Sequence, residues 1–211
     1  MQFAREIGDL EAMAAFARLL ARVLRPGDVL GLDGPLGAGK TTLVRMLAGE
    51  LGADTGLVSS PTFVIAAEYP CSGGVFLTHV DAYRVRNSAE LEGTGWDERT
   101  GDEIAVVEWS ERIADVLGKD AARVRIVPTG QNSRRVEVAL PESWGERPEV
   151  AGLLRGDTTC PVTGRRVLGE NPHWPFVDER ARLADLYRWF SGERALGRPV
   201  GPEDDDEAAS N

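Results

Sequence analysis

Eight residues near the N-terminus combine glycines, a lysine and a hydroxyl side chain at a spacing typical of phosphate binding. Residues 34–41 read Gly-Pro-Leu-Gly-Ala-Gly-Lys-Thr, which fits the P-loop pattern G-x-x-x-x-G-K-[ST]. The glycines let the backbone turn tightly, and its N–H groups and the start of the following helix form an anion site. In such a loop Lys40 contacts the β- and γ-phosphates, as a candidate catalytic residue, and the Thr41 hydroxyl binds Mg²⁺. The residues predicted to hold phosphates are Gly37, Ala38, Gly39, Lys40, Thr41 and Thr42.

The sequence on either side of this motif has the order strand, loop, helix that a P-loop requires. Residues 29–33 form an apolar run of strand length, and residues 42–48 place apolar side chains at a helical spacing. Of the 24 Lys and Arg residues, only Lys40 and Lys119 are lysines. A compact ammonium group fits inside a phosphate cradle better than a broad guanidinium group. This combination favours a nucleotide site over a glycine-rich turn that binds nothing.

Two other apolar runs each end on a carboxylate. Residues 75–80 lead to Asp81, and residues 104–107 lead to Glu108. In an open parallel sheet the C-terminal ends of the strands converge on the ligand crevice, where an acidic residue helps to hold Mg²⁺ in P-loop enzymes. Asp81 and Glu108 are therefore candidate catalytic residues and, with Thr41, candidate metal ligands.

Two polar stretches are less specific. His79 lies two residues before Asp81, so both side chains project from one face of a strand, although a lone histidine is more often structural than catalytic. Residues 59–62, Ser-Ser-Pro-Thr, resemble a switch segment that touches the γ-phosphate or Mg²⁺, with Thr62 as a nucleotide contact. An ordinary Ser/Pro turn explains residues 59–62 equally well.

The remaining periodicity predicts an α/β fold for residues 1–141. Apolar positions in residues 9–24 indicate an amphipathic helix, and residues 63–69 are a plausible strand. Residues 122–127 and 134–140 alternate on either side of a turn, which predicts an antiparallel hairpin at the end of a mixed sheet. We therefore expect a P-loop NTPase-like three-layer sandwich with a mixed, mostly parallel sheet.

The C-terminal part of the chain differs in composition. Proline, glycine and arginine dominate residues 142–176, which we expect to form a linker. Residues 177–196 carry apolar side chains at a helical spacing, so a C-terminal amphipathic helix is expected there. Its apolar face predicts docking on this chain's own core, with partner binding as the alternative. Residues 197–211 include five consecutive acidic side chains and are expected to be a disordered end.

Composition restricts the environment and the partners. No apolar run among the 211 residues approaches the length of a membrane span, and the N-terminus lacks a signal-peptide pattern, so we expect a cytoplasmic protein without membrane contact. Cys71 and Cys160 have no disulfide-framework or metal-site spacing. The net charge of −10 opposes a large nucleic-acid interface. Any RNA contact is therefore expected to be indirect or transient, and the isolated chain is expected to be a monomer.

The ordered set of motifs resembles the bacterial TsaE (YjeE) family over about residues 1–140. The P-loop and the Ser-Pro-Thr stretch are followed by His-Val-Asp-Ala-Tyr-Arg at 79–84, Glu-Leu-Glu at 90–92 and Val-Glu-Trp at 107–109. Members of this family are small ATPases required for threonylcarbamoyladenosine modification of tRNA position 37. The resemblance implies weak ATP hydrolysis in isolation and activity tied to a complex of TsaD and TsaB. The family supports turnover of that complex and does not itself transfer the threonylcarbamoyl group.

Matched motif to motif, the resemblance also implies roles for individual residues, with ATP or ADP and Mg²⁺ as cofactors. Thr41 and Glu108 would hold Mg²⁺, and Trp109 would lie near the nucleotide. Asp81 would lie beside the metal or the attacking water, and Thr62 at the switch. Whether Asp81 or Glu108 binds the metal directly stays open. The family often has a bulkier residue where this chain has alanine, directly after Asp81.

A small-molecule P-loop kinase is the main alternative. Such enzymes close an arginine-rich lid over two substrates, and Arg84, Arg86 and Arg99 are the candidates for one. A GTP-binding switch protein needs an Asn-Lys-x-Asp motif, which is absent because the only lysines are at 40 and 119. A third reading, an assembly factor whose ATP hydrolysis is incidental, is distinguished only by its partner binding.

Overall fold

The computed structural model describes residues 1–58, 66–85, 89–92, 96, 101–169 and 171–191. The chain divides into two compact units, Met1–Gly156 and Asp157–Asn211, which are described separately. Thr62 and the acidic end at 197–211 lie outside the described residues, so the expectations for them stay predictions.

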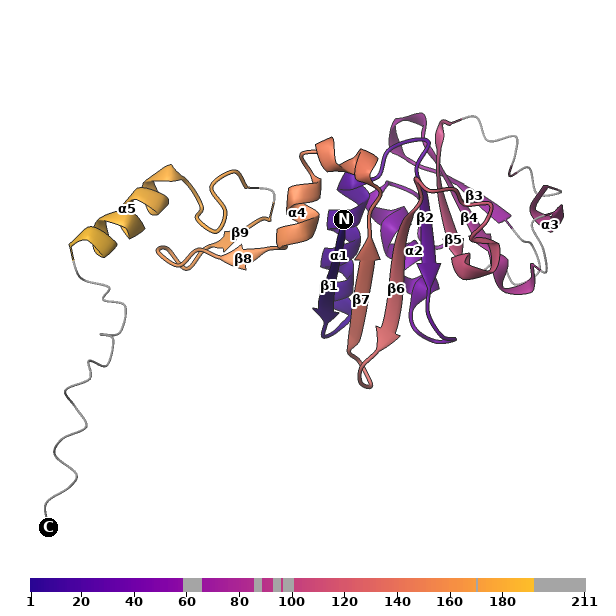
Figure 1. Ribbon diagram of the computed structural model, residues 1–211, viewed down its shortest axis with the longest axis horizontal. Coiled ribbons are helices and arrows are strands. Elements are labelled where there is room, and N and C mark those ends of the chain that lie inside the picture. The colour runs from indigo at the N-terminus through magenta and orange to yellow at the C-terminus, as the bar shows by residue number, and fades with distance from the viewer. Residues whose placement is uncertain (59–65, 86–88, 93–95, 97–100, 170, 192–211) are drawn as a thin grey trace, which may run out of the picture. The chain divides into compact units, whose positions relative to one another are not determined.

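A mixed sheet forms the centre of the first unit (Figure 1). Its described strands are β1 Gln2–Ile7, β2 Val29–Asp33, β3 Ala66–Pro70, β4 Phe76–Asp81, β5 Glu103–Glu108, β6 Ala122–Pro128 and β7 Arg134–Ala139. They lie in the order β1-β7-β6-β2-β5-β4-β3. The central pairs β6–β2, β2–β5 and β5–β4 are parallel, whereas β1–β7, β7–β6 and β4–β3 at the two edges are antiparallel. The α/β fold with its C-terminal hairpin is confirmed, with the parallel pairing concentrated at the centre of the sheet.

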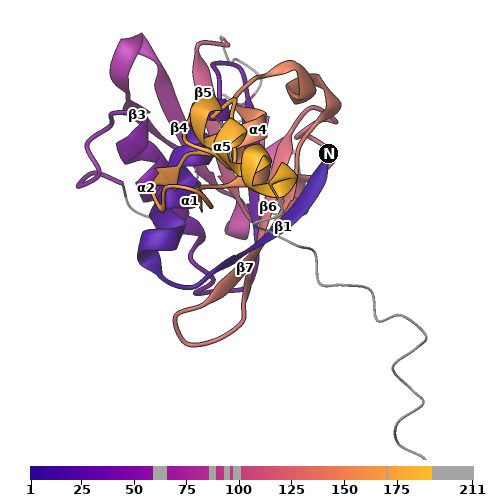
Figure 2. The ribbon, with the colours of Figure 1, turned by 90° about the vertical axis from the view of Figure 1, so that its left-hand side faces the viewer.

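Two helices, α1 Leu10–Val23 and α2 Lys40–Glu50, pack together beside the sheet (Figures 1 and 2). The Asp9 side chain caps α1 by accepting a hydrogen bond from the Ala12 N–H at 2.8 Å, as is usual at a helix start. Phe16 of α1 and Leu43 of α2 are almost completely buried and belong to the larger hydrophobic core. This core fixes α2, whose first residues belong to the P-loop.

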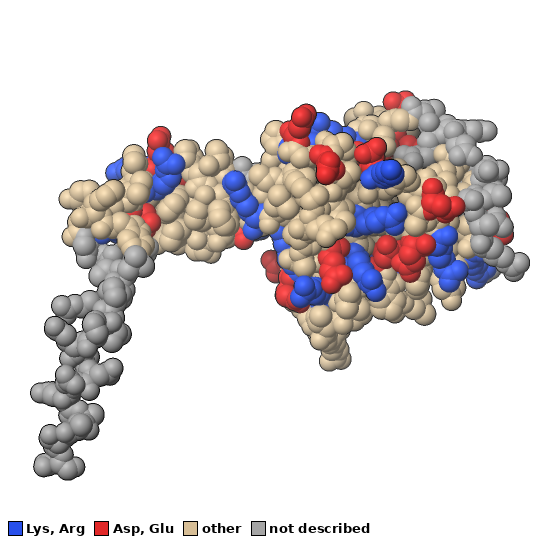
Figure 3. Space-filling view, viewed as in Figure 1, with Lys and Arg blue, Asp and Glu red and all other residues tan. Residues whose placement is uncertain are grey.

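A second, smaller core lies at β4 and β5. It includes Val80, Val107 and side chains from three short helices: η2 Ala82–Arg84, α3 Ala89–Glu92 and η4 Ser110–Ile113. Alternate residues of β6 and β7, including Arg125, Arg135 and Glu137, are exposed. Figure 3 shows side chains of both charges interspersed over the first unit on the side that faces the viewer. These side chains of β6 and β7 are therefore open to solvent, whereas the side chains of the smaller core at β4 and β5 are buried.

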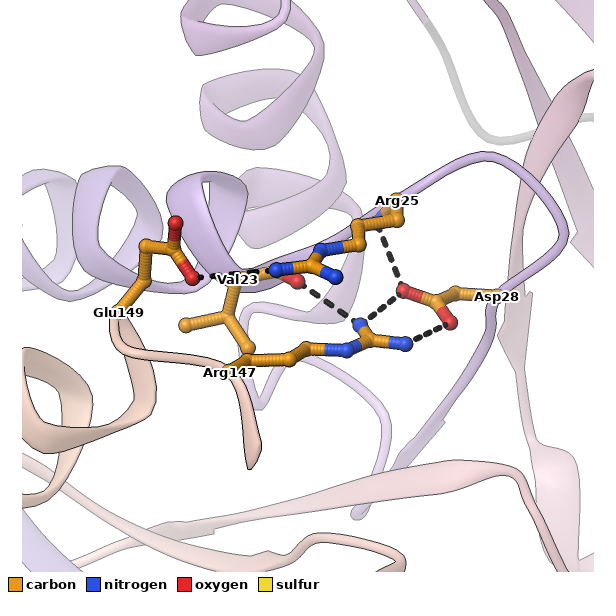
Figure 4. Close-up of polar contacts among 5 residues, drawn as sticks. All are labelled: Val23, Arg25, Asp28, Arg147 and Glu149. Atoms are coloured by element: carbon orange, nitrogen blue, oxygen red, sulfur yellow. Dashed lines mark hydrogen bonds and ion pairs between the residues drawn. The ribbon is translucent and has the colours of Figure 1, made fainter. Parts of the chain in front are cut away.

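Residues 142–156 differ from the linker expected at 142–176, because they fold as part of the first unit. They form η5 Glu142–Glu146 and α4 Val150–Arg155, in which Trp144 and Leu153 are buried. The guanidinium of Arg147 donates to both carboxylate oxygens of Asp28, at 2.6 and 2.8 Å, and to the Val23 carbonyl at 2.9 Å (Figure 4). This stretch is rich in proline, glycine and arginine, so its few apolar side chains, which are buried in the folded unit, could not be recognised from the composition.

The second unit contains a short hairpin and one longer helix. Strands β8 Thr158–Thr159 and β9 Arg166–Val167 pair antiparallel. Helix α5 Glu179–Phe190 lies inside the range expected to be helical, and the Asp178 side chain caps it by accepting from the Ala181 N–H at 2.8 Å. Cys160, Val167 and Ala181 form a small core with Trp174 and Phe176 against it. Docking of this helix on the first unit stays a prediction.

Among the helices that the structure describes, none combines the length and hydrophobicity needed to cross a bilayer.

Candidate functional site

The P-loop connects the end of β2 to the start of α2, and its glycines adopt backbone angles that other residues rarely adopt. Gly34 has φ 137°, and a Cβ atom at this position would overlap the carbonyl of Ile126 on β6. Gly39 has φ 108° and immediately precedes Lys40, the first residue of α2. The Leu43 N–H donates to the Gly39 carbonyl at 2.9 Å, which starts the helical hydrogen bonding. The glycine spacing thus sets both the loop and the helix N-terminus that faces an anion.

Lys40 is buried beside this loop. Its Nζ donates to the carbonyls of Gly34 at 2.8 Å and Pro35 at 3.1 Å, and lies 3.6 Å from the centroid of the Trp109 ring. Desolvation by burial lowers the pKa of Lys40 below its usual value, because burial disfavours the charged form. Four carboxylates counteract this effect on the pKa: Glu108, Glu111, Asp81 and Asp33.

Thr41 and Glu108 come from different elements and meet directly. The Thr41 hydroxyl donates to Oε1 of Glu108 at 2.7 Å. Glu108 is only 3% exposed, and its Oε1 also lies 2.9 Å from Nε2 of the buried His79. The P-loop hydroxyl and the acid at the end of β5 therefore form one polar cluster.

Asp81 lies next to this cluster because of the strand register. It is the direct partner of Glu108 in the parallel pairing of β4 with β5. Its Oδ1 accepts a hydrogen bond from the Tyr83 N–H at 3.0 Å, which caps the turn after β4. The two acids predicted from strand ends thus lie side by side at the edge of the sheet where the P-loop begins.

Trp109 has a backbone conformation that is unusual for a large side chain. Its φ of 60° and ψ of 41° are left-handed, which costs energy for any residue with a Cβ. Its N–H donates to the Leu32 carbonyl at 2.8 Å. Its ring is close to Lys40 and also to Tyr83, whose ring centroid is 5.0 Å away. The turn after β5 therefore directs the indole toward the P-loop lysine.

A cavity of about 570 Å³ adjoins the P-loop at Gly37, Ala38 and Gly39. This volume is within the range of small-molecule sites. The first turn of α1 and the turn between β6 and β7 form its walls, and Arg134 donates from Nε to the Ala38 carbonyl at 3.0 Å. Its lining includes Ile7, Asp9, Leu10, Glu11, Met13, Gly37, Ala38, Gly39, Thr42, Gln131, Asn132 and Arg134.

Comparison with known proteins identifies the group to which these features belong. The sequence model of the threonylcarbamoyl adenosine biosynthesis protein TsaE matches residues 7–136, which is more than half of the chain. This protein belongs to the TsaE family.

Individual relatives agree with that assignment to the TsaE family. The tRNA threonylcarbamoyladenosine biosynthesis protein TsaE of Streptomyces coelicolor is 45% identical over 139 residues, covering 63% of this chain and 93% of the relative. The Bacillus subtilis protein of the same name is 40% identical, covering 60% and 78%. The crystal structure of Bacillus subtilis YdiB superposes with a TM-score of 0.55 at 31% identity, covering 69% of this chain and 90% of that one. The family functions in tRNA threonylcarbamoyladenosine biosynthesis.

The donor atoms of this TsaE-family site fit Mg²⁺, the metal that the P-loop motif implies. The Thr41 hydroxyl and the carboxylates of Glu108 and Asp81 are hard oxygen donors of the kind that Mg²⁺ binds, with phosphate oxygens and water as its remaining ligands. Within the described ranges, no group of three or more His, Cys, Asp or Glu side chains forms a metal site made only of protein ligands. A metal held partly by phosphate is consistent with this set.

Two acidic residues, Asp33 and Glu111, lie beside the start of the P-loop in this TsaE-family protein. Oδ1 of Asp33 accepts hydrogen bonds from the Ser110 hydroxyl at 2.8 Å and from the Glu111 N–H at 3.0 Å. A side-chain hydrogen bond to Asp33, together with partial desolvation and the Asp33 charge, raises the pKa of Glu111 to about 7. Neither acid was among the site residues predicted from the sequence.

The structure brings most of the sequence-predicted residues together and adds others. Lys40 and Thr41 of the P-loop contact Trp109 and Glu108, and Asp81 lies beside Glu108 in the strand register. Thr62 lies outside the described residues. The predicted phosphate-binding residues that also line the large cavity are Gly37, Ala38, Gly39 and Thr42. The sequence did not single out the cavity residues that come from distant segments, which are Asp9, Glu11, Gln131, Asn132 and Arg134. The helix-cap position of Asp9 and the turn at 130–133 were the only local signals for them.

Proposed function

We propose that this protein binds ATP with Mg²⁺ and hydrolyses it, weakly in isolation, as an accessory protein of tRNA threonylcarbamoyladenosine synthesis. The observation that carries this proposal is the 2.7 Å hydrogen bond from the Thr41 hydroxyl to Glu108, with Lys40 in the same loop. Thr41 follows the P-loop glycines and Glu108 ends a parallel strand, which is where P-loop enzymes place their Mg²⁺-binding hydroxyl and acid.

Each side chain has a distinct task in this proposal. Lys40 binds the β- and γ-phosphates and stabilises charge on the phosphoryl group that is transferred. Thr41 and Glu108 hold Mg²⁺, which supplies positive charge to the phosphate oxygens. Asp81, at the neighbouring strand end, orients the attacking water. Gly37, Ala38, Gly39 and Thr42 bind phosphate oxygens through the P-loop backbone and the start of α2.

The cavity beside the P-loop is the proposed site of the adenosine. Leu10 and Met13 offer apolar surface to a base, and Asn132 and Gln131 offer hydrogen-bonding groups. Arg134 joins this wall to the P-loop through its contact with the Ala38 carbonyl. Adenine is preferred over guanine because the sequence lacks the Asn-Lys-x-Asp motif that reads guanine.

The proposed partners are the synthase TsaD and its scaffold TsaB, whose turnover the ATP hydrolysis would support. Membership of the TsaE family and the names of the two relatives, which refer to tRNA threonylcarbamoyladenosine biosynthesis, support this link. A pull-down from the native organism with and without ATP tests it. Recovery of TsaD and TsaB that depends on ATP is expected, and recovery of neither protein would contradict the link.

Single substitutions of the two acids test the chemistry. Glu108→Ala should weaken Mg²⁺-dependent nucleotide binding, whereas Asp81→Ala should preserve binding and lower turnover. Calorimetry with ADP and with a non-hydrolysable ATP analogue, at increasing Mg²⁺, measures binding, and phosphate release measures turnover. The opposite pattern would exchange the two roles, and equal loss of both properties in both variants would contradict separate tasks. Transfer of phosphate to a metabolite, in place of release, would favour the alternative of a small-molecule kinase.

A further inference from the structure

A buried histidine contacts the acid of the proposed metal site. His79 lies on β4 and is 0% exposed, and its Nε2 is 2.9 Å from Oε1 of Glu108. The same oxygen accepts a hydrogen bond from the Thr41 hydroxyl at 2.7 Å. Among the described residues, no side chain donates a hydrogen bond to the other carboxylate oxygen, Oε2. Both contacts therefore fall on one oxygen of Glu108 and leave the second oxygen available.

We propose that His79 is a positioning residue, which holds Glu108 so that its carboxylate is oriented to bind Mg²⁺. This inference rests on the proposed function, because it requires Glu108 to be a metal ligand. An ionised carboxylate accepts hydrogen bonds only, so the contact places the proton of a neutral His79 on Nε2. Substitution of a hydrogen-bond partner that orients a metal ligand in this way typically lowers metal affinity about 10- to 100-fold.

The second ring nitrogen of His79 supports a functional reason for the residue. Nδ1 is buried and has no hydrogen-bond partner among the described residues. Burial of an unpaired polar atom opposes folding, so this histidine weakens the fold at Nδ1 while its Nε2 contacts Glu108. The strand neighbours of His79 offer Nδ1 no side-chain partner. His79 pairs in register with Ala67 on β3 and Val106 on β5, and neither residue has a polar side chain.

A histidine that only fills the core and one that positions Glu108 predict different results on substitution. His79→Leu keeps a similar volume, removes the unpaired Nδ1 and removes the Nε2 donor. His79→Gln keeps a donor N–H at the position of Nε2, because its side chain has the same number of bonds to that nitrogen. His79→Asn keeps a polar group only near the position of Nδ1. The Gln and Asn variants are therefore matched in chemistry and differ in which ring nitrogen they replace.

The test compares these variants in the full-length protein. Isothermal calorimetry measures ADP affinity with and without Mg²⁺, and thermal denaturation measures stability. We expect His79→Leu to lower Mg²⁺ affinity in the ADP complex about 10- to 100-fold, with ADP affinity in the absence of Mg²⁺ unchanged and a melting temperature no lower than that of the wild type. His79→Gln should recover most of the Mg²⁺ affinity, and His79→Asn should resemble His79→Leu.

One outcome would overturn the role of His79 and leave the proposed function standing. In that outcome His79→Leu keeps full Mg²⁺ affinity, while hydrolysis by the wild type still depends on Mg²⁺. Absence of any Mg²⁺ effect in the wild type would remove the proposed function and the inference together. If His79→Leu does not fold, the comparison of the Gln and Asn variants still tests the role of the Nε2 donor. Equal Mg²⁺ affinity in those two variants would show that the Nε2 donor does not matter.

Discussion

Loss of the Arg147 guanidinium should destabilise the first unit, because this side chain joins residues 142–156 to the end of α1 and to the turn before β2. Arg147 and Asp28 are 14% and 10% exposed, and two hydrogen bonds of 2.6 and 2.8 Å join them. A third bond of 2.9 Å reaches the Val23 carbonyl. The guanidinium also lies 4.3 Å from the Trp144 ring centroid. Arg147→Met removes the charge and keeps the aliphatic packing.

The expected cost follows from this burial. Removal of one partner of a buried ion pair typically costs about 3–5 kcal/mol. Here the Arg25 N–H continues to donate to Asp28 at 2.7 Å, so the lower end, about 3 kcal/mol, is expected for the free energy of unfolding. For a unit of this size 1 kcal/mol shifts the melting temperature by about 2–4 °C, so the midpoint should fall by about 6–12 °C.

A neighbouring arginine provides a matched control (Figure 4). Arg25 pairs with Glu149 at 3.5 Å, and their side chains are 53% and 39% exposed. Exposed pairs of this kind contribute less than about 1 kcal/mol, so Arg25→Met should leave the midpoint almost unchanged. Differential scanning calorimetry compares the two variants. Equal midpoints for Arg147→Met and Arg25→Met would refute the conclusion that residues 142–156 are an integral part of the first unit.

Four further outcomes are expected. Trp109→Phe should abolish a change in tryptophan fluorescence on nucleotide binding, and a signal that persists would place the reporting indole elsewhere. Because the pKa of Glu111 is raised to about 7 from 4.5, the folded state keeps a proton that the unfolded chain loses. The melting temperature should therefore fall as pH rises from about 5 to 7.5, and Glu111→Gln should flatten this slope. Equal dependence of melting temperature on pH in the wild type and Glu111→Gln would contradict the raised pKa of Glu111. Gly34→Ala should lower the free energy of unfolding by about 3 kcal/mol or more, because φ of Gly34 is positive and the added Cβ would meet the Ile126 carbonyl. A midpoint equal to that of the wild type would show that the loop relaxes to accept the Cβ. Truncation after Leu140 should lower the midpoint more than truncation after Gly156, because it also removes the buried Trp144. Equal midpoints for the two truncated proteins would contradict the boundary after Gly156.

Much of the site was predictable because local rules encode it. The glycines of the P-loop fix the loop by their own backbone angles, so residues 34–41 could be interpreted without the rest of the chain. Asp81 and Glu108 could be paired because parallel strand ends converge on one edge of a sheet. The contact of His79 with Glu108 depends on side-chain orientation across β4 and β5, so only its strand face was predictable.

Other features depend on distant contacts that a single sequence does not reveal. Strand β1 exists because Gln2–Ile7 pairs with β7, from Gln2 opposite Ala139 to Ile7 opposite Arg134, and its own residues gave no clear signal. The large cavity combines the start of α1 with the turn at 130–133. The left-handed backbone of Trp109 is held by its hydrogen bond to Leu32, and no local pattern indicates it.

Phosphate release from ATP by the purified protein, measured with and without Mg²⁺, tests the central claim most directly. The wild type should release phosphate slowly and only with Mg²⁺. Lys40→Ala should reduce this rate at least about 100-fold, with an unchanged circular dichroism spectrum. Equal rates in the wild type and Lys40→Ala would contradict the proposal that this P-loop catalyses ATP hydrolysis.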